Sequence, residues 1–240
     1  GTAVVRVNTT GLAIDETLEI PGSSAAGVDV TFATGDRVTR FEALGAQLSL
    51  LGQTLTGDFS FDKAAAAGAA AGALRIAATN VTLSLGDSSS PAVRVTGGHG
   101  ALVMTADGIA GELAGTLVLA VPGVSFSGTF SLAINTTAAT VHQVFTVGQT
   151  EIPLDLPTGP YLRVSGEGVN LTVLGQTLTG DFLFERVTAA DGSAVTALAA
   201  SNVTFALTAG GSTVVSLTGG HGAFVINSTG LAGELGGNVT

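Results

Sequence analysis

The nine-residue stretch LGQTLTGDF occurs twice in this chain of 240 residues, at 51–59 and again at 174–182. The agreement extends well beyond it, because residues 40–61 align with residues 163–184. Two segments that match over this length, at a spacing of about 122 residues, indicate two copies of one structural unit. This internal repeat constrains the fold more than any other feature of the sequence.

The copies divide the chain into a first unit at 1–127, cut out of phase, and an incomplete second unit at 128–240. VTGGHGALVM at 95–104 has its counterpart in LTGGHGAFVI at 217–226. Both ends of the sequence fall inside the pattern, so we expect the natural chain to continue into further units.

Apolar and polar residues alternate through most of each unit, as in VSFSGTFSL at 124–132. Such alternation is typical of β-strands with one buried face. Turn signals such as VPGV and TAGGS separate the runs, and the intervals leave no room for crossover helices. The sequence therefore predicts an all-β fold, an antiparallel up-and-down meander of long strands.

Runs that are apolar on both faces, such as GTLVLAVPG at 115–123, predict a sheet that is covered on both sides. We expect the tandem units to stack or coil into an extended rod. A β-solenoid and a sandwich-like packing both satisfy this pattern.

The composition excludes several classes of partner. The formal net charge of −10, with 8 Lys and Arg in all, leaves no basic face for nucleic acid or an anionic membrane. No window reaches the ~18 apolar residues of a membrane helix, so we expect no membrane span. The chain has no cysteine and hence no disulfide or thiolate metal site.

Every asparagine lies in an N-x-[ST] pattern, which makes each a candidate for glycosylation: Asn8, Asn80, Asn135, Asn170, Asn202, Asn227 and Asn238. One interpretation is a secreted or surface protein that carries N-glycans. The other is that β alternation places Thr or Ser two positions after an outward Asn, and that the repeat multiplies the coincidence.

Four acidic residues recur at the repeat distance, Asp58 and Asp181 in TGDF and Glu112 and Glu234 in AGEL. If units stack, such carboxylates form rows, and rows of carboxylates can hold Ca²⁺. No EF-hand loop accompanies them, so solvated or Arg-paired acids are the favoured interpretation, and we expect no cofactor other than this candidate Ca²⁺.

The three histidines do not suggest a metal site or a catalytic site. His99 and His221 occupy equivalent GGHGA segments among Gly, Ala and Thr, and His142 has neither a counterpart nor a partner in the sequence. Nucleophilic catalysis needs a Ser or Thr held by a His and an acid, and no such constellation is apparent. We therefore expect no enzyme activity.

One segment differs between the copies. KAAAAGAAAGA at 63–73 is rich in alanine, whereas its counterpart is RVTAADGSAVT at 186–196. The difference is typical of a loop that varies freely, and a lateral contact surface is the alternative.

The blocks YLRVSGEGVNLTVLGQTLTGDFLFE, LAASNVTFAL and GHGAFVINSTGLAGEL resemble the tandem repeats of giant bacterial secreted or cell-surface proteins of the adhesin-like, LEPR-XLL type. The resemblance implies an extracellular or cell-surface location and a role in attachment or surface architecture. It leads us to expect a structural protein that self-associates into a fibre, stalk or sheath. The alternative is an adhesin module whose variable loops engage other cells or glycans.

Overall fold

The computed structural model describes residues 1–19, 27–50, 53–63, 72–86, 90–188 and 192–240. These residues form strands and no helix. The strands are β1 (Thr2–Asn8), β2 (Ile14–Leu18), β3 (Val28–Phe32), β4 (Val38–Leu50), β5 (Gln53–Asp62), β6 (Leu74–Gly86), β7 (Pro91–Thr105), β8 (Gly108–Val121), β9 (Val124–Asn135), β10 (Val141–Val147), β11 (Thr150–Leu156), β12 (Tyr161–Val173), β13 (Gln176–Thr188), β14 (Ala194–Ala209), β15 (Ser212–Asn227) and β16 (Gly230–Val239). In this described part of the chain, nothing forms a helix that could cross a membrane.

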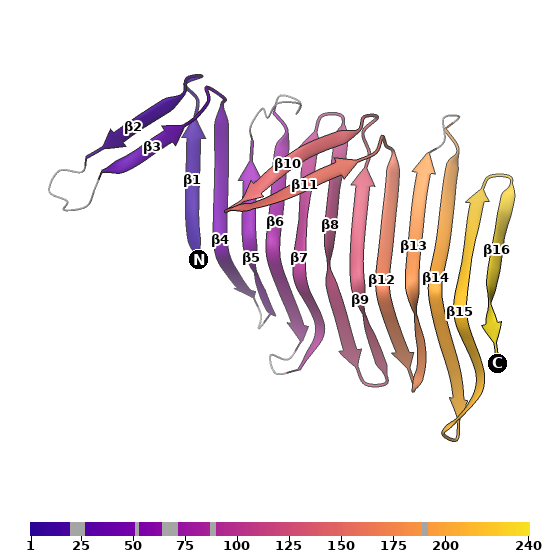
Figure 1. The fold of residues 1–240 in the computed structure, drawn as a ribbon. Coiled ribbons are helices and arrows are strands. Elements are labelled where there is room, and N and C mark those ends of the chain that lie inside the picture. Colours follow the sequence, from indigo (N-terminus) through magenta and orange to yellow (C-terminus); the bar gives the residue numbers. More distant parts are fainter. Residues whose placement is uncertain (20–26, 51–52, 64–71, 87–89, 189–191) are drawn as a thin grey trace.

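One open antiparallel sheet of 12 strands makes up most of the molecule, in the order β1-β4-β5-β6-β7-β8-β9-β12-β13-β14-β15-β16. The chain runs up and down through this sheet and leaves it twice. β2 and β3 form a hairpin between β1 and β4, and β10 and β11 form a hairpin between β9 and β12 (Figure 1). The predicted all-β antiparallel meander is confirmed.

Segments that are alike in sequence occupy corresponding places in this sheet. β4 pairs with β1 and β5, and β12 pairs in the same way with β9 and β13. In both places a hairpin precedes the strand. Most of the alanine-rich stretch at 63–73 lies outside the described residues, so the hypothesis of a lateral contact there concerns a part that the structure does not describe.

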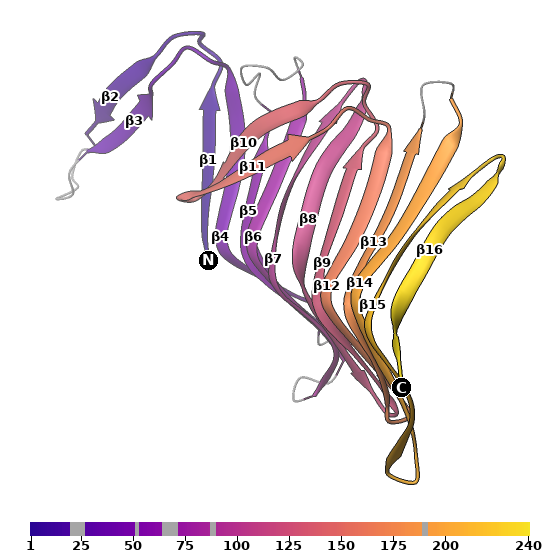
Figure 2. The same ribbon diagram turned by 45° about the vertical axis from the view of Figure 1, so that its right-hand side comes forward.

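A band of β-bulges crosses the sheet near its middle. The register shifts between Ala43 and Ala46 in β4 and between Gly166 and Val169 in β12, and further shifts follow in the next strands. Bulges bend a strand and increase its twist. The sheet accordingly folds along this band, which we call the crease, and its two halves lie at an angle (Figure 2).

The crease depends on residues that adopt left-handed backbone conformations. Gly45 and Gly168 both have φ 58°, a region that glycine enters without steric cost. Asn80 and Asn202 have φ 55°, and asparagine is one of the few other residues that tolerate it. The local sequence therefore sets where the long strands bend.

The hairpin β10–β11 covers one side of the sheet, which we call the hairpin face. β10 packs across β5 and β6, and β11 packs across β7, β8 and β9. The hairpin contributes the larger apolar side chains of the core, and the sheet beneath it contributes mainly small ones. The core residues are Phe145, Val147, Ile152, Leu154 and Leu156 from the hairpin, Ala77, Ala101, Val103, Ala110, Ala133 and Tyr161 from the sheet, and Ala73 just before β6. Small side chains allow the hairpin to approach the sheet closely.

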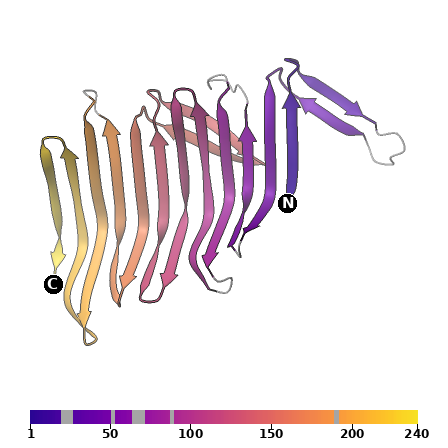
Figure 3. The same ribbon diagram turned by 180° about the vertical axis from the view of Figure 1, so that it is seen from behind.

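The opposite side, which we call the phenylalanine face, is apolar over a wide area. The strand register places one apolar residue from each of five successive strands side by side: Leu132, Val164, Phe184, Leu198 and Phe224. Seen from behind, no described element packs over this face (Figure 3). The sheet is thus covered in part on the hairpin face, and the predicted cover on both sides is not present among the described residues.

Candidate functional site

The contact between the β10–β11 hairpin and the sheet is the most highly organised site in the described structure. Arg75 on β6 lies buried beneath the hairpin. Its guanidinium donates to Asp62 Oδ2 at 3.2 Å, to Gln143 Oε1 at 3.2 Å and to the Val144 carbonyl at 2.7 Å. It also lies 4.4 Å from the centre of the Phe145 ring. One sheet residue therefore holds the hairpin through charge, hydrogen bonds and a cation–π contact.

Burial lowers the pKa of Arg75 from its ordinary value, and the positive charge of Arg40 acts in the same direction. The carboxylate of Asp62 opposes both effects.

Two further sheet residues bind the hairpin. Arg40 donates to the Thr146 carbonyl, and Glu42 accepts from the backbone N–H of Gly148 at 2.8 Å. Polar groups at the hairpin tip and stem thus find partners on the sheet.

Asparagines anchor the points at which the chain leaves the sheet. Asn135 ends β9 and is 0% exposed. Its Oδ1 accepts from the N–H and the hydroxyl of Thr137, and its Nδ2 donates to the carbonyls of Ala139 and Pro157. The Thr two positions after the asparagine is therefore a hydrogen-bonding partner in an Asx turn.

The same turn occurs at Asn8, at the end of β1. Asn8 Oδ1 accepts from the N–H and hydroxyl of Thr10, and Nδ2 donates to the Leu12 carbonyl. Asn227 repeats the Oδ1 contacts with Thr229 in an exposed turn. Local turn geometry thus gives a physical reason for asparagine and threonine at this spacing.

Two further asparagines pair with the repeated aspartates at the crease. Hydrogen bonds from the Asn80 side chain, at 2.7 Å, and the Gly45 N–H, at 2.6 Å, lower the pKa of Asp58. The Gly168 N–H, at 2.8 Å, and the Asn202 side chain, at 2.7 Å, lower the pKa of Asp181.

These Asp–Asn pairs tie each bulge to the strand beside it, since every contact joins neighbouring strands of the sheet. The pairing is the same in both halves of the chain.

A glycan would attach to the Nδ2 atom that these contacts use. In the folded chain Nδ2 of Asn8, Asn80, Asn135 and Asn202 already donates to a carbonyl or carboxylate. Glycosylation stays a prediction, and the exposed side chains best placed for it are those of Asn170, Asn227 and Asn238.

The sheet keeps the four repeated acids apart. Asp58 on β5 and Asp181 on β13 are separated by six strand-to-strand steps, about 29 Å at ~4.8 Å per step. Glu112 on β8 and Glu234 on β16 are separated by six steps as well. One Ca²⁺ takes oxygens at about 2.3–2.6 Å, so neither pair can share an ion within this sheet. Within the described ranges no group of three or more metal-ligating side chains occurs.

The histidines have local partners. Nδ1 of His99 lies 3.0 Å from the Gly97 carbonyl, and Nδ1 of His221 lies 2.9 Å from that of Gly219. His142 lies opposite Asp155 in the hairpin register, with Nδ1 2.7 Å from Oδ1. The prediction that His142 lacks a partner is wrong, because the partner comes from the adjacent strand.

The phenylalanine face contains a hollow of about 460 Å³ along the crease. Aromatic residues line it, among them Phe126, Phe130, Phe182 and Phe224. The Phe126 and Phe130 rings stack with their centres 5.3 Å apart. The lining offers apolar contact and almost no polar groups, so it suits an apolar surface rather than a polar ligand.

Comparisons with protein-family models, with curated proteins and with solved structures gave no match. The functional interpretation therefore depends on the geometry of the chain itself.

The sequence did not indicate the Arg75 site under the hairpin, because the residue that corresponds to Arg75 in the second copy is an alanine, Ala197. The N-T-T sequences at Asn8 and Asn135 are a signal for Asx turns, but they match the glycosylation pattern equally well.

Proposed function

We propose that this chain is a structural protein of an extracellular fibre, stalk or sheath, built from stacked β-units of about 122 residues. It acts through shape and self-association and has no catalytic role. The resemblance to giant bacterial surface proteins supports this location and this role.

The observation that carries the proposal is the packing of one unit upon the other. The hairpin β10–β11 belongs to the second unit, and it lies on strands β5 to β8 of the first. The strands of both units hydrogen-bond into one sheet through β8 and β9. A unit that pairs with its neighbour and also clasps it can be added repeatedly without a change of geometry.

The alternative function is an adhesin module that engages other cells or glycans through variable loops. The loops at 63–73 and 186–196 would carry it, and both fall partly outside the described residues. The packing of the hairpin on the sheet supports the structural function directly, whereas no described contact supports the adhesin.

Electron microscopy of the purified chain, over a range of concentrations, tests the proposal. Each unit contributes six strands to the main sheet, so we expect an axial repeat of about 29 Å per unit and about 58 Å per chain at ~4.8 Å per strand. Elongated particles that lengthen with concentration and show this repeat would support the structural function. Single compact particles at every concentration would contradict it.

A further inference from the structure

The two ends of the sheet carry the counterparts of an interface that is closed in the middle of the molecule, except that Ala197 stands where Arg75 binds the hairpin. In the middle, β8 pairs with β9, and the hairpin that follows β9 folds back onto the sheet. At one end β16 is an edge strand that corresponds in sequence to β8. At the other end β1 is an edge strand that corresponds to β9.

The small apolar residues that β10–β11 covers on the hairpin face have uncovered counterparts at the β16 end of the sheet. Ala77, Ala101, Val103 and Ala110 are at most 3% exposed beneath β10–β11. Their sequence counterparts are identical residues at Ala199, Ala223, Val225 and Ala232, and the register places these on neighbouring strands in the same rows. Ala223, Val225 and Ala232 are exposed, and no described hairpin lies above them.

The hairpin β2–β3 has an uncovered apolar side at the opposite end. It projects beyond β1, away from the sheet (Figure 1). Leu18, Val28 and Val30 occupy the hairpin positions that Phe145, Ile152 and Leu154 occupy in β10–β11. In the second hairpin these positions are buried, whereas Leu18 is 58% exposed and Val28 is 50% exposed.

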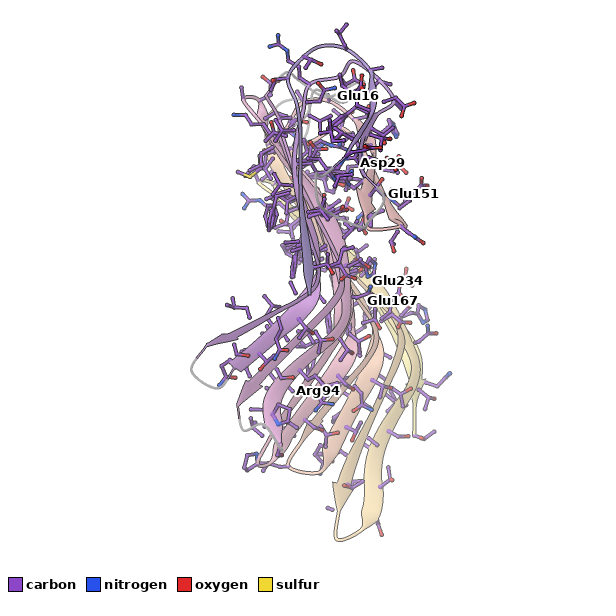
Figure 4. The ribbon with its side chains drawn as sticks, turned by 90° about the vertical axis from the view of Figure 1, so that its left-hand side faces the viewer. Glu16, Asp29, Arg94, Glu151, Glu167 and Glu234 are labelled. Carbon is purple, nitrogen blue, oxygen red and sulfur yellow. The ribbon has the colours of Figure 1, made fainter. Side chains whose placement is uncertain are left out.

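The two edges of the sheet bring together one pair of opposite charges and one apolar pair. Transferring the β8–β9 register to β16 and β1 places Glu234 opposite Arg6 and Leu235 opposite Val5. Leu235 and Val5 are 72% and 69% exposed, and both lie on the phenylalanine face. Glu16 and Asp29 of the first hairpin lie on the same side of the sheet as Glu234 (Figure 4), so these three side chains carry like charge, and Arg6 supplies the opposite charge beside Glu234.

We propose that a second copy of this chain docks head to tail, with its β1 paired to β16 and its β2–β3 hairpin clasped onto Ala199, Ala223, Val225 and Ala232. The inference rests on the proposed structural function and specifies the surface that it uses. The two partners contribute different patches, so the contact is heterologous, and a docked copy still offers a patch for the next one. It also removes both exposed sheet edges, which otherwise invite unspecific pairing.

Paired cysteines test the register, because these 240 residues contain no cysteine. Two single variants, Val5→Cys and Leu235→Cys, are mixed and oxidised. Directly opposed strand residues have Cα atoms about 4.5–5.5 Å apart, within the range of a disulfide. We expect a cross-linked dimer from this pair. Val4→Cys mixed with Leu235→Cys is the matched control, since a one-residue shift places the thiols on opposite faces.

Charge reversal tests the interface in solution. We expect Arg6→Glu and Glu234→Arg each to weaken self-association about tenfold, and the double variant to recover most of it. Leu18→Asn should abolish association, whereas Thr17→Asn should not, because Thr17 lies on the outward side of the same hairpin and an Asn there can still donate to Asp29, as the Thr17 hydroxyl does at 2.7 Å. Circular dichroism establishes that each variant retains its β structure.

The outcomes separate this inference from the proposed function. A Val5–Leu235 cross-link together with charge recovery supports the docking. Assemblies that persist with no such cross-link and no effect of charge reversal overturn the docking and leave the structural function in place. A chain that stays monomeric at all concentrations in sedimentation overturns both.

Discussion

Asn135 offers the sharpest test of the view that the asparagines of this chain are built into its turns. The side chain is 0% exposed and makes four hydrogen bonds, two through Oδ1 and two through Nδ2. These bonds close the turn from which the β10–β11 hairpin departs. Replacing Asn135 with alanine removes all of them at once.

The expected loss follows from these contacts. At about 1 kcal/mol of net stability for each hydrogen bond, the four bonds sum to roughly 4 kcal/mol. Water entering the space left by the amide satisfies part of the freed backbone, so we expect the free energy of unfolding to fall by about 3 kcal/mol. Asn135→Asp keeps the Oδ1 acceptor but turns a carboxylate oxygen toward two carbonyls, so the loss at pH 7 should be at least as large.

Urea unfolding followed by circular dichroism measures this loss, and amide hydrogen exchange of β10 and β11 reports whether the hairpin opens first. Asn227→Ala is the matched control, because Asn227 makes the same Oδ1 contacts with Thr229 in an exposed turn. We expect Asn227→Ala to lower the free energy of unfolding by about 1 kcal/mol. If the two alanine variants differ by less than about 1 kcal/mol, the assignment of a buried anchoring role to Asn135 is refuted.

Three other predictions concern the core, the crease and pH. Leu154→Ala should lower the unfolding free energy by about 3 kcal/mol in urea titrations, since Leu154 is buried between hairpin and sheet, whereas Val144→Ala on the outward side of β10 should have little effect. Gly98→Ala should lower the melting temperature and reduce the free energy of unfolding by about 1–3 kcal/mol, because the added Cβ would lie 2.9 Å from Val81 Cβ. Hydrogen bonds depress the folded pKa of Asp58 and Asp181, so their stabilisation is present above the ordinary value of 3.8 and is lost as the pH falls through the folded pKa. Acid titration of a variant with Asp58→Asn and Asp181→Asn should therefore show a flatter loss of stability below that value, and an unchanged curve would contradict the role of these two carboxylates.

Much of the fold could be predicted from local sequence. Side chains alternate along a strand with a period of two, so runs such as 124–132 identify strands and their apolar side. The turn signals at VPGV and TAGGS identified tight connections, and β8–β9 and β14–β15 are joined there. The match between 51–59 and 174–182 predicted two copies of one structural unit, and the corresponding strands β5 and β13 both carry the aspartate of an Asp–Asn pair at the crease.

The sequence by itself thus determined the strands, their antiparallel order and the recurrence of the pattern, because these depend on neighbours along the chain. Only the tertiary structure decided which surfaces meet. Nothing local indicates that β10–β11 turns back over earlier strands or that Arg75 binds Gln143, 68 positions further along the chain. Nor does anything local indicate that Asp58 and Asp181 lie six strand-to-strand steps apart. Such contacts join residues far apart in sequence, and they follow from the packing of whole faces, which the period of two leaves open.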